Sequence, residues 1–200
     1  MIGVTKVMDD GLIATLHLPS GTGPRPAVIV LSGSGGGIAS AIVWGEPLAA
    51  LGYAVLSVAY FAMDGLPADL VEIPLEYVKH AIDWVRAHPA IDATRVGLLG
   101  HSRGGEAALL VAAEYHEIRA VVANVPSHVV WQGVQPDPTI KRSAWSQDGM
   151  ALPFVSLETP RTGSSWSDWF ATSLSDGALR ASADGIHGNE VARPVWTAKW

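Results

Sequence analysis

The fold of this chain is decided by the stretch Val96-Gly97-Leu98-Leu99-Gly100-His101-Ser102-Arg103-Gly104-Gly105. Its apolar opening predicts a short buried strand, and residues 106–115 predict a helix. The turn between them has the pattern G-x-S-x-G, in which a strand passes directly into a helix and holds a serine at the junction. This turn forces Ser102 into a strained conformation, and a Cβ at Gly100 or Gly104 would collide as the helix folds back across the strand. Ser102 is therefore the candidate nucleophile; the alternative is a small-residue turn without chemistry.

Strands and helices alternate on both sides of this turn. Apolar runs predict strands at residues 2–7, 12–18, 27–31, 53–60, 95–99 and 118–125, and apolar spacing predicts helices at 39–51, 71–88 and 106–115. Asp9-Asp10-Gly11 separates the first two strands and predicts a hairpin. The alternation predicts a mainly parallel sheet with helices on both faces, and together with the turn at Ser102 it indicates an α/β-hydrolase fold.

The 200 residues are enough for a single domain, 1–200, with a core over about 1–130 and a loop-rich, atypical tail over about 131–200. A hydrolase sheet normally continues for two strands past the one expected at 118–125. The tail carries scattered Trp rather than runs of Val, Ile and Leu, so we expect the sheet to be C-terminally incomplete. Residues beyond about Thr159 should pack loosely over the sheet or its open edge. A truncation or a shifted reading frame would produce such a tail.

A glycine-rich loop, Ser32-Gly33-Ser34-Gly35-Gly36-Gly37, follows the strand at 27–31. In this fold the oxyanion hole combines the N–H of the residue after the nucleophile, here Arg103, with an N–H from such an earlier loop. Ser34 or Gly35 is the expected second donor. The alternatives are a flexible turn and, less well supported because no Gly-Lys-Ser/Thr follows, a phosphate cradle.

A base for Ser102 is harder to find, because the fold expects an acidic residue and then a histidine downstream. His187 lies in a glycine-flanked loop after Asp176 and Asp184, and is either the base or a solvated loop residue. His128 follows the strand at 118–125, where it would line the substrate pocket rather than act as base. Since the tail lacks the expected strands, we predict that neither Asp184 nor His187 reaches Ser102.

Residues 26–160 carry a set of motifs that resembles a known family, the acyl-CoA thioesterase and bile acid-CoA:amino acid N-acyltransferase family, in its C-terminal catalytic domain. The motifs are Leu31-Ser32-Gly33-Ser34-Gly35-Gly36, Leu66-Pro67, Ile73-Pro74-Leu75-Glu76-Tyr77, His88-Pro89, Ile91-Asp92, Arg95-Val96-Gly97-Leu98-Leu99-Gly100, Ser102-Arg103-Gly104-Gly105-Glu106 and Pro126-Ser127-His128-Val129-Val130-Trp131-Gln132-Gly133.

The resemblance implies attack on an acyl thioester or ester and an acyl-enzyme intermediate. Animal members commonly carry Cys at the nucleophile position, and Ser102 in its place favours hydrolysis over aminoacyl transfer. The family's usual N-terminal β-sandwich is expected to be missing, and the tail from Thr159 does not resemble the family. The alternatives are a dienelactone-hydrolase-like carboxylesterase and a catalytically weak hydrolase core that lacks a full triad.

Composition excludes several other classes of function. The net charge is −6 and the 13 Lys and Arg are scattered, so we expect no nucleic-acid partner. With 0 Cys, covalent catalysis must use an oxygen nucleophile. The 7 His show no zinc-ligand spacing, and we predict neither metal nor cofactor. No apolar run reaches membrane-spanning length and no signal-peptide core is found, so a cytoplasmic location without membrane contact is expected.

Overall fold

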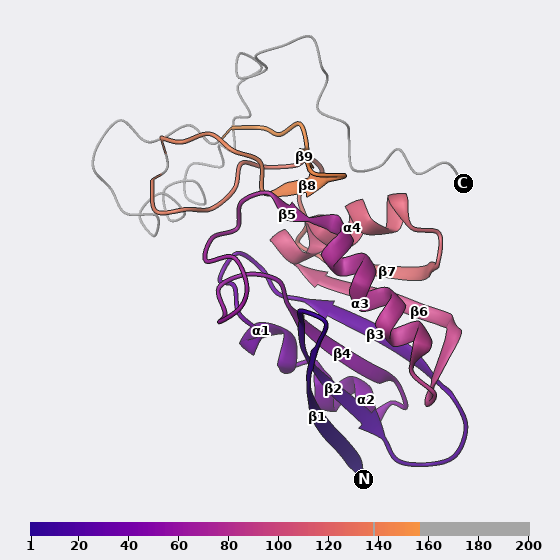
Figure 1. Ribbon diagram of the computed structural model, residues 1–200. Coiled ribbons are helices and arrows are strands. Elements are labelled where there is room, and N and C mark those ends of the chain that lie inside the picture. The colour runs from indigo at the N-terminus through magenta and orange to yellow at the C-terminus, as the bar shows by residue number, and fades with distance from the viewer. Residues whose placement is uncertain (138, 157–200) are drawn as a thin grey trace.

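A six-stranded sheet forms the centre of the protein in the computed structural model, which describes residues 1–137 and 139–156 (Figure 1). The strand order is β1-β2-β4-β3-β6-β7. The strands are β1 (Ile2–Asp9), β2 (Leu12–Pro19), β3 (Arg25–Leu31), β4 (Ala54–Ala59), β6 (Ile91–His101) and β7 (Ile118–Asn124). β3 pairs parallel with β4 and β6, and β6 pairs parallel with β7, while β2 pairs antiparallel with both β1 and β4. The predicted mainly parallel sheet is confirmed.

The hairpin β1–β2 turns at the predicted place. Asp10 and Gly11 have φ angles of 45° and 79°, the two positive values that a tight two-residue turn between twisted strands requires. β2 pairs antiparallel with β4, so the hairpin adds two antiparallel strands to the edge of the parallel sheet.

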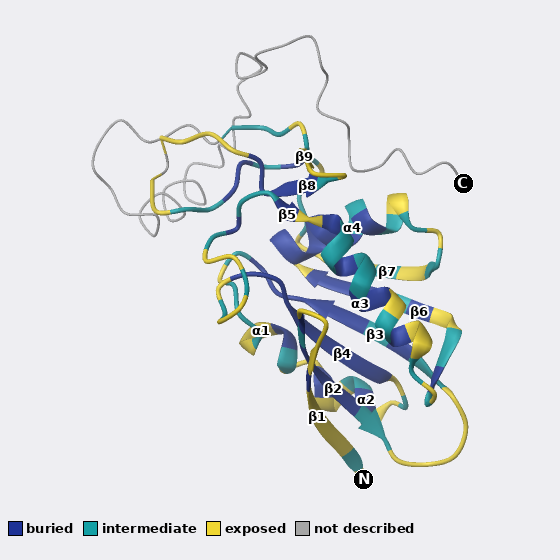
Figure 2. Cartoon of the chain, viewed as in Figure 1, coloured by how far each residue is buried: buried dark blue, intermediate teal, exposed yellow. Residues whose placement is uncertain are grey.

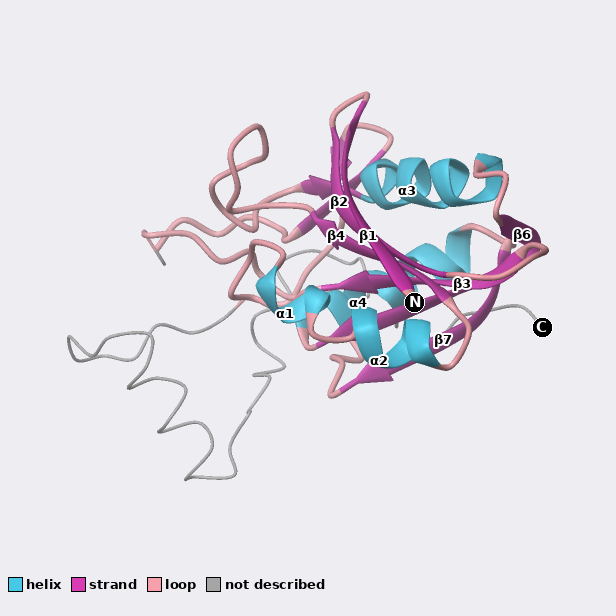
Figure 3. Cartoon of the chain, turned by 90° about the horizontal axis from the view of Figure 1, so that it is seen from below, coloured by secondary structure: helices cyan, strands magenta, loops and turns pink. Residues whose placement is uncertain are grey.

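Helices cover both faces of the sheet, as predicted. The helices are α1 (Ala39–Ile42), α2 (Gly45–Ala50), α3 (Leu75–Ala87) and α4 (Arg103–Glu114). Ile29 and Leu31 of β3 pack in a core with residues of α3 and α4, whereas Val30 packs in a second core with residues of α1 and α2. Successive strand residues point to opposite faces, so β3 is buried on both (Figure 2). Figure 3 shows α3 on the opposite side of the sheet from α1 and α2.

The single helix predicted at 39–51 is wrong, because two short helices occupy this segment. Pro47 has no N–H and could not continue the hydrogen-bond ladder of a helix begun at Ala39. It is tolerated in the first turn of α2, where N–H groups have no helical partner.

A small second sheet was not predicted. It consists of β5 (Ile73–Pro74), β8 (Trp145–Gln147) and β9 (Met150–Ala151), in the order β5-β8-β9. Asp148 and Gly149, with φ of 50° and 72°, form the turn between β8 and β9. Trp145 is fully buried in the larger core, so the structure draws part of the segment beyond residue 130 into the packed interior.

Candidate active site

Ser102 lies at the junction between β6 and α4, in an unusual backbone conformation. Its φ is 52° and its ψ is −116°, a region that residues with a side chain rarely adopt. Backbone hydrogen bonds hold it on both sides. The Ser102 N–H donates to the Asn124 carbonyl at 2.9 Å, and the Ser102 carbonyl accepts the Glu106 N–H at 3.0 Å. The side chain is partly exposed at the carboxyl edge of the parallel strands, where this class of sheet binds ligands.

Two glycines make the sharp turn possible. A Cβ on Gly100 would lie 2.0 Å from the Gly104 carbonyl oxygen, and one on Gly104 would lie 2.3 Å from the Ser32 carbonyl oxygen. Both neighbours are backbone atoms and cannot move aside without displacing a strand or the helix.

Gly104→Ala is expected to destabilise the fold. Alanine in a helix is favoured over glycine by about 1 kcal/mol, but forcing its Cβ into the backbone of β3 costs about 1–3 kcal/mol or more. Urea unfolding should therefore show a net loss of stability. Gly3→Ala is the matched control, since the nearest atom to its Cβ is 3.7 Å away; an equal loss in both variants would contradict the tight approach at Gly104.

The glycine-rich loop after β3 lies directly against this turn. Gly33 is buried, and a Cβ on it would lie 3.2 Å from the His101 carbonyl oxygen and 3.3 Å from the Ser102 Cβ. The Gly36 N–H donates to the Gly33 carbonyl at 3.2 Å, which places Ser34 and Gly35 at the tip of a turn. The loop that the sequence put beside the nucleophile is thus its neighbour in space.

Tyr60 holds the glycine-rich loop by a hydrogen bond from the protein interior. Its hydroxyl donates to the Ser32 carbonyl, and the Gly37 N–H donates to the Phe61 carbonyl at 3.0 Å. The tyrosine hydroxyl is protonated at neutral pH and can donate this bond, and burial raises its pKa further above its usual range. The Ser32 hydroxyl closes the loop by donating to the Gly37 carbonyl at 3.1 Å.

Three backbone N–H groups in the serine turn and the adjacent glycine-rich loop have no hydrogen-bond partner among the described residues. They belong to Arg103, at the first position of α4, and to Ser34 and Gly35 at the loop tip. The first N–H groups of a helix lack partners within it and carry the positive end of its dipole. The N–H of Arg103, next to Ser102, is thus free of a backbone partner among the described residues, as are those of Ser34 and Gly35 in the neighbouring loop.

The positions of the histidines do not identify a base for Ser102. His187, together with Asp176 and Asp184, lies outside the described residues. His128 is exposed in the segment after β7 and makes no hydrogen bond in the described part of the chain. His101 also lies at the site, where its Nδ1 contacts the Asn124 side-chain Nδ2 at 3.1 Å. Sequence reasoning missed this pair, although the predicted parallel strands placed both residues at neighbouring carboxyl ends.

A buried ion pair under the nucleophile was also missed. The Arg103 Nη1 lies 3.2 and 3.0 Å from the two carboxylate oxygens of Glu106, and the residues are 8% and 0% exposed. Burial raises the pKa of Glu106, while the Arg103 charge opposes that rise. The i, i+3 spacing of these opposite charges in the first turn of α4 was a signal available in the sequence.

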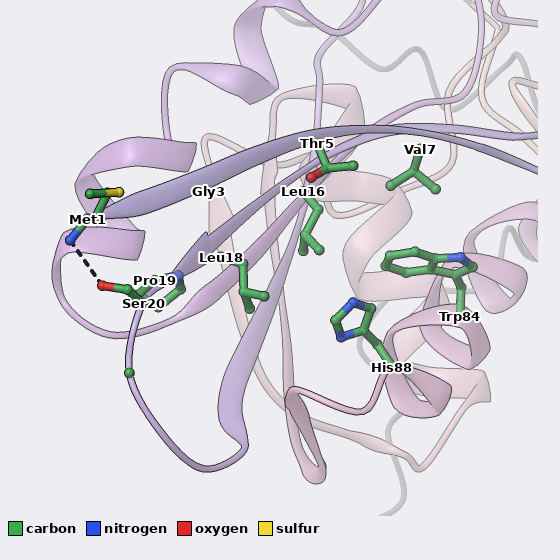
Figure 4. Close-up of a pocket in the computed structure, with 11 residues that line it drawn as sticks. Met1, Gly3, Thr5, Val7, Leu16, Leu18, Pro19, Ser20, Trp84 and His88 are labelled. Carbon is green, nitrogen blue, oxygen red and sulfur yellow. Dashed lines mark hydrogen bonds between the residues drawn. The ribbon is translucent and has the colours of Figure 1, made fainter.

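An open groove of about 520 Å³ lies elsewhere on the molecule (Figure 4). Leu16 and Leu18 of β2 line one side, and Trp84 and His88 from the end of α3 line the other. His88 precedes the start of β6, so the groove lies toward the amino ends of the parallel strands, whereas Ser102 follows the carboxyl end. It is not part of the candidate site.

Two further observations concern the described residues alone. No helix in the described ranges is long and apolar enough to cross a membrane. The same ranges contain no group of three His, Asp or Glu side chains arranged to hold a metal ion. The predicted absence of a metal stays a prediction.

The fold and the serine turn define the class of protein as an α/β hydrolase. The structure resembles the esterase of Pyrobaculum calidifontis with a TM-score of 0.55 and 22% identity, over 66% of this chain and 47% of that chain. It also resembles a dienelactone hydrolase-like promiscuous phosphotriesterase from metagenomic libraries, with a TM-score of 0.51 and 22% identity, over 64% of this chain and 59% of that one. These likenesses confirm the predicted fold.

Sequence comparisons show which proteins the chain is similar to. Residues 73–145 match the family described as BAAT / Acyl-CoA thioester hydrolase C terminal. The chain is 39% identical over 109 residues to acyl-coenzyme A thioesterase 1 of Mus musculus, covering 54% of this chain and 26% of the relative. It is 33% identical over 158 residues to acyl-coenzyme A thioesterase 1 of Homo sapiens, covering 74% of this chain and 37% of the relative. Residues 73–145 thus match the BAAT / acyl-CoA thioester hydrolase C-terminal family and the chain is similar to acyl-coenzyme A thioesterases, so the predicted resemblance is confirmed. The chain spans well under half the length of these relatives.

Proposed function

We propose that the chain is a serine hydrolase that cleaves acyl thioesters or esters through an acyl-enzyme on Ser102. The observation that carries the proposal is the strained conformation of Ser102 between β6 and α4, with unpaired N–H groups around it. Strain of this kind persists where function requires it. The names of the relatives, acyl-coenzyme A thioesterases, support an acyl-CoA thioester as the substrate.

The proposed reaction has two steps. The Ser102 Oγ forms a bond to the acyl carbon, and the carbonyl oxygen becomes an oxyanion. When the oxyanion re-forms the carbonyl, the bond from the acyl carbon to the leaving sulfur or oxygen breaks. The serine proton passes through a base to the leaving group. Water then attacks the acyl-enzyme and returns the proton to Ser102, releasing a carboxylic acid.

The proposed oxyanion hole consists of the Arg103 N–H and an N–H of Ser34 or Gly35. These groups are fixed before the substrate arrives, so stabilising the developing charge requires little reorganisation. Removal of one such donor lowers turnover by about 10²–10³-fold in hydrolases of this kind. His128 is proposed to line the substrate pocket.

A general base for Ser102 would be a histidine, and His187 is the candidate in the sequence. Because the tail lacks the strands that would carry it to the site, we predict that His187 does not reach Ser102. His187→Ala should therefore leave the rate of Ser102 labelling by a fluorophosphonate within about twofold of the wild type, whereas loss of a true base costs about 10²–10⁴-fold. A loss of that size would identify His187 as the base and a complete triad. An unchanged rate would favour a catalytically weak core that keeps its nucleophile.

The leaving group separates the proposed thioesterase from a dienelactone-hydrolase-like carboxylesterase. We expect a fatty acyl-CoA to be cleaved with a higher kcat/KM than the p-nitrophenyl ester of the same acid. Free CoA and nitrophenol can be measured in parallel assays of one preparation. Preference for the ester would replace the thioesterase assignment with the carboxylesterase.

The first experiment is labelling of the purified chain with a fluorophosphonate, followed by mass spectrometry of the modified peptide. The expected modification is on Ser102. Modification of Ser34 or Ser127 instead, or none at all, would contradict the proposal.

We further propose a small-molecule substrate without nucleic-acid or membrane partners, and a cytoplasmic location, although one relative is named as mitochondrial.

A further inference from the structure

The ion pair under Ser102 connects the nucleophile turn to two distant segments of the chain. The Glu106 Oε1 accepts the backbone N–H of Trp131 at 3.1 Å and the indole Nε1–H of Trp145 at 2.8 Å. The Arg103 Nη2 donates to the Gln132 carbonyl. The buried carboxylate therefore has a charged partner and two neutral donors, and the guanidinium spans from the helix to the segment after β7.

The pair also constrains the peptide unit between Ser102 and Arg103. The carbonyl of this unit accepts the Glu106 N–H at 3.0 Å, and its N–H is the proposed oxyanion donor. A peptide unit is planar and trans, so fixing the carbonyl direction fixes the direction of the N–H on its other side. The Arg103 side chain, held by Glu106 and Gln132, restrains the Cα next to that N–H.

Stability alone is a weak reason for such a pair. Well-packed apolar residues of similar volume are often as stabilising as a buried ion pair, because the charges lose their hydration. The guanidinium, by contrast, adds directional precision, because its Nη1 faces the Glu106 carboxylate while its Nη2 donates to the Gln132 carbonyl. Precision matters at this position, one residue beyond the nucleophile.

We propose that Arg103 and Glu106 are positioning residues that aim the Arg103 N–H at the oxyanion formed on Ser102. Neither side chain touches the substrate. The inference rests on the proposed function. It predicts that weakening the pair lowers the rate of the chemical step and leaves ground-state binding unchanged, because the N–H contact is strongest when the charge has formed.

The test is the kinetics of fluorophosphonate labelling in Glu106→Gln, which keeps the size of the side chain and an acceptor oxygen but removes the charge. The maximal labelling rate should fall by about 10- to 100-fold, a large part of the effect of losing a donor. The half-saturating probe concentration should stay within about twofold. Because only folded molecules label, the end point counts competent sites, and the rate of the labelled fraction is unaffected by losses in folding.

Glu72→Gln is the matched control. Glu72 forms a bidentate pair with Arg142 on the surface, at 3.0 and 2.6 Å, and makes no hydrogen bond or ion pair with α4 among the described residues. Its labelling rate should equal that of the wild type. Arg103→Lys keeps the charge beside Glu106 without the planar fork, and should give an intermediate rate.

The outcomes separate the two proposals. A wild-type protein that is not labelled on Ser102 overturns the proposed function and this inference with it. If the wild type is labelled on Ser102 but the labelled fractions of Glu106→Gln and Arg103→Lys react at the wild-type maximal rate, only the positioning role is overturned. A fall of the same size in Glu72→Gln would also overturn it, since the effect would not be specific to the pair.

Discussion

Ser102→Ala is expected to reduce the hydrolysis of acyl thioesters and esters by more than about 10³-fold, the largest effect of any single change in this chain. Alanine keeps the backbone of the turn and removes only the oxygen that forms the acyl-enzyme, so the covalent route is lost. The N–H groups of Arg103 and the glycine-rich loop remain, and oxyanion stabilisation and binding alone leave some catalysis over water. Turnover of an acyl-CoA and a nitrophenyl ester measures the loss, and fluorophosphonate labelling should disappear.

Ser127→Ala provides the matched control for that experiment. Ser127 lies in the segment after β7, where its hydroxyl donates to the Val129 carbonyl at 2.7 Å and accepts the Val129 N–H at 3.1 Å. Its loss should loosen a local turn and leave labelling intact. Labelling that survives Ser102→Ala, or that disappears in Ser127→Ala, would remove Ser102 from the centre of the mechanism.

Arg103→Met is expected to have the second largest effect, a loss of about 3–5 kcal/mol in the free energy of unfolding at neutral pH. Methionine fills much of the space of the arginine stem but leaves the fully buried Glu106 carboxylate without its charged partner. The donors from Trp131 and Trp145 remain and limit the loss. Urea unfolding, followed by the fluorescence of buried tryptophan, measures it.

The loss should depend on pH in a definite direction. Burial raises the pKa of Glu106 in the folded protein above its unfolded value, and the Arg103 charge is the largest influence that lowers it. Without Arg103 the folded pKa rises further. A raised carboxyl pKa leaves stability unaffected below the unfolded pKa and reduces it as the pH rises toward the folded one. The difference between wild type and Arg103→Met should therefore shrink as the pH is lowered from 7 toward 4.5.

Glu72→Gln should also lose less stability as the pH falls, but for a different reason. The hydrogen bond from Arg142 lowers the pKa of Glu72, so the stability that this pair contributes is present above the unfolded pKa and is lost as the pH falls. The pair is partly exposed, and its loss should be small compared with that of Arg103→Met. A pH-independent loss in Arg103→Met would show that packing, rather than the charge of Glu106, dominates at this site.

The regular part of the fold could be predicted because its signals are local. Continuous apolar runs at β3 and β4 indicate strands buried on both faces, and Asp10-Gly11 indicates a hairpin turn. The second small sheet has the same local signal in Asp148-Gly149, which the scattered polar composition around it obscured. The broken helix at 39–51 could have been predicted from Pro47, since a missing N–H within a helix has a strong local effect.

The candidate site divides in the same way. Ser102 could be found from sequence because a G-x-S-x-G turn, a preceding strand and a following helix are contiguous. The proposed loop donors could be placed at the same sheet edge, since parallel strands bring their carboxyl ends together. Asn124 beside His101, and Tyr60 under the glycine-rich loop, depend on contacts between segments that sequence patterns do not relate.

The sequence by itself determined the α/β alternation, the serine turn and the need for Gly100, whose Cβ would clash with the backbone of nearby Gly104 and so depends on local geometry alone. The need for Gly104 comes from the packing of α4 against the end of β3, because a Cβ there would meet the Ser32 carbonyl oxygen. The tertiary structure alone decided that Glu106 lies fully buried against Arg103, Trp131 and Trp145. On an isolated helix the two charges would face water, where such a pair has little effect. Only packing against residues 25 and 39 positions away removes the water and gives their interaction its strength and direction.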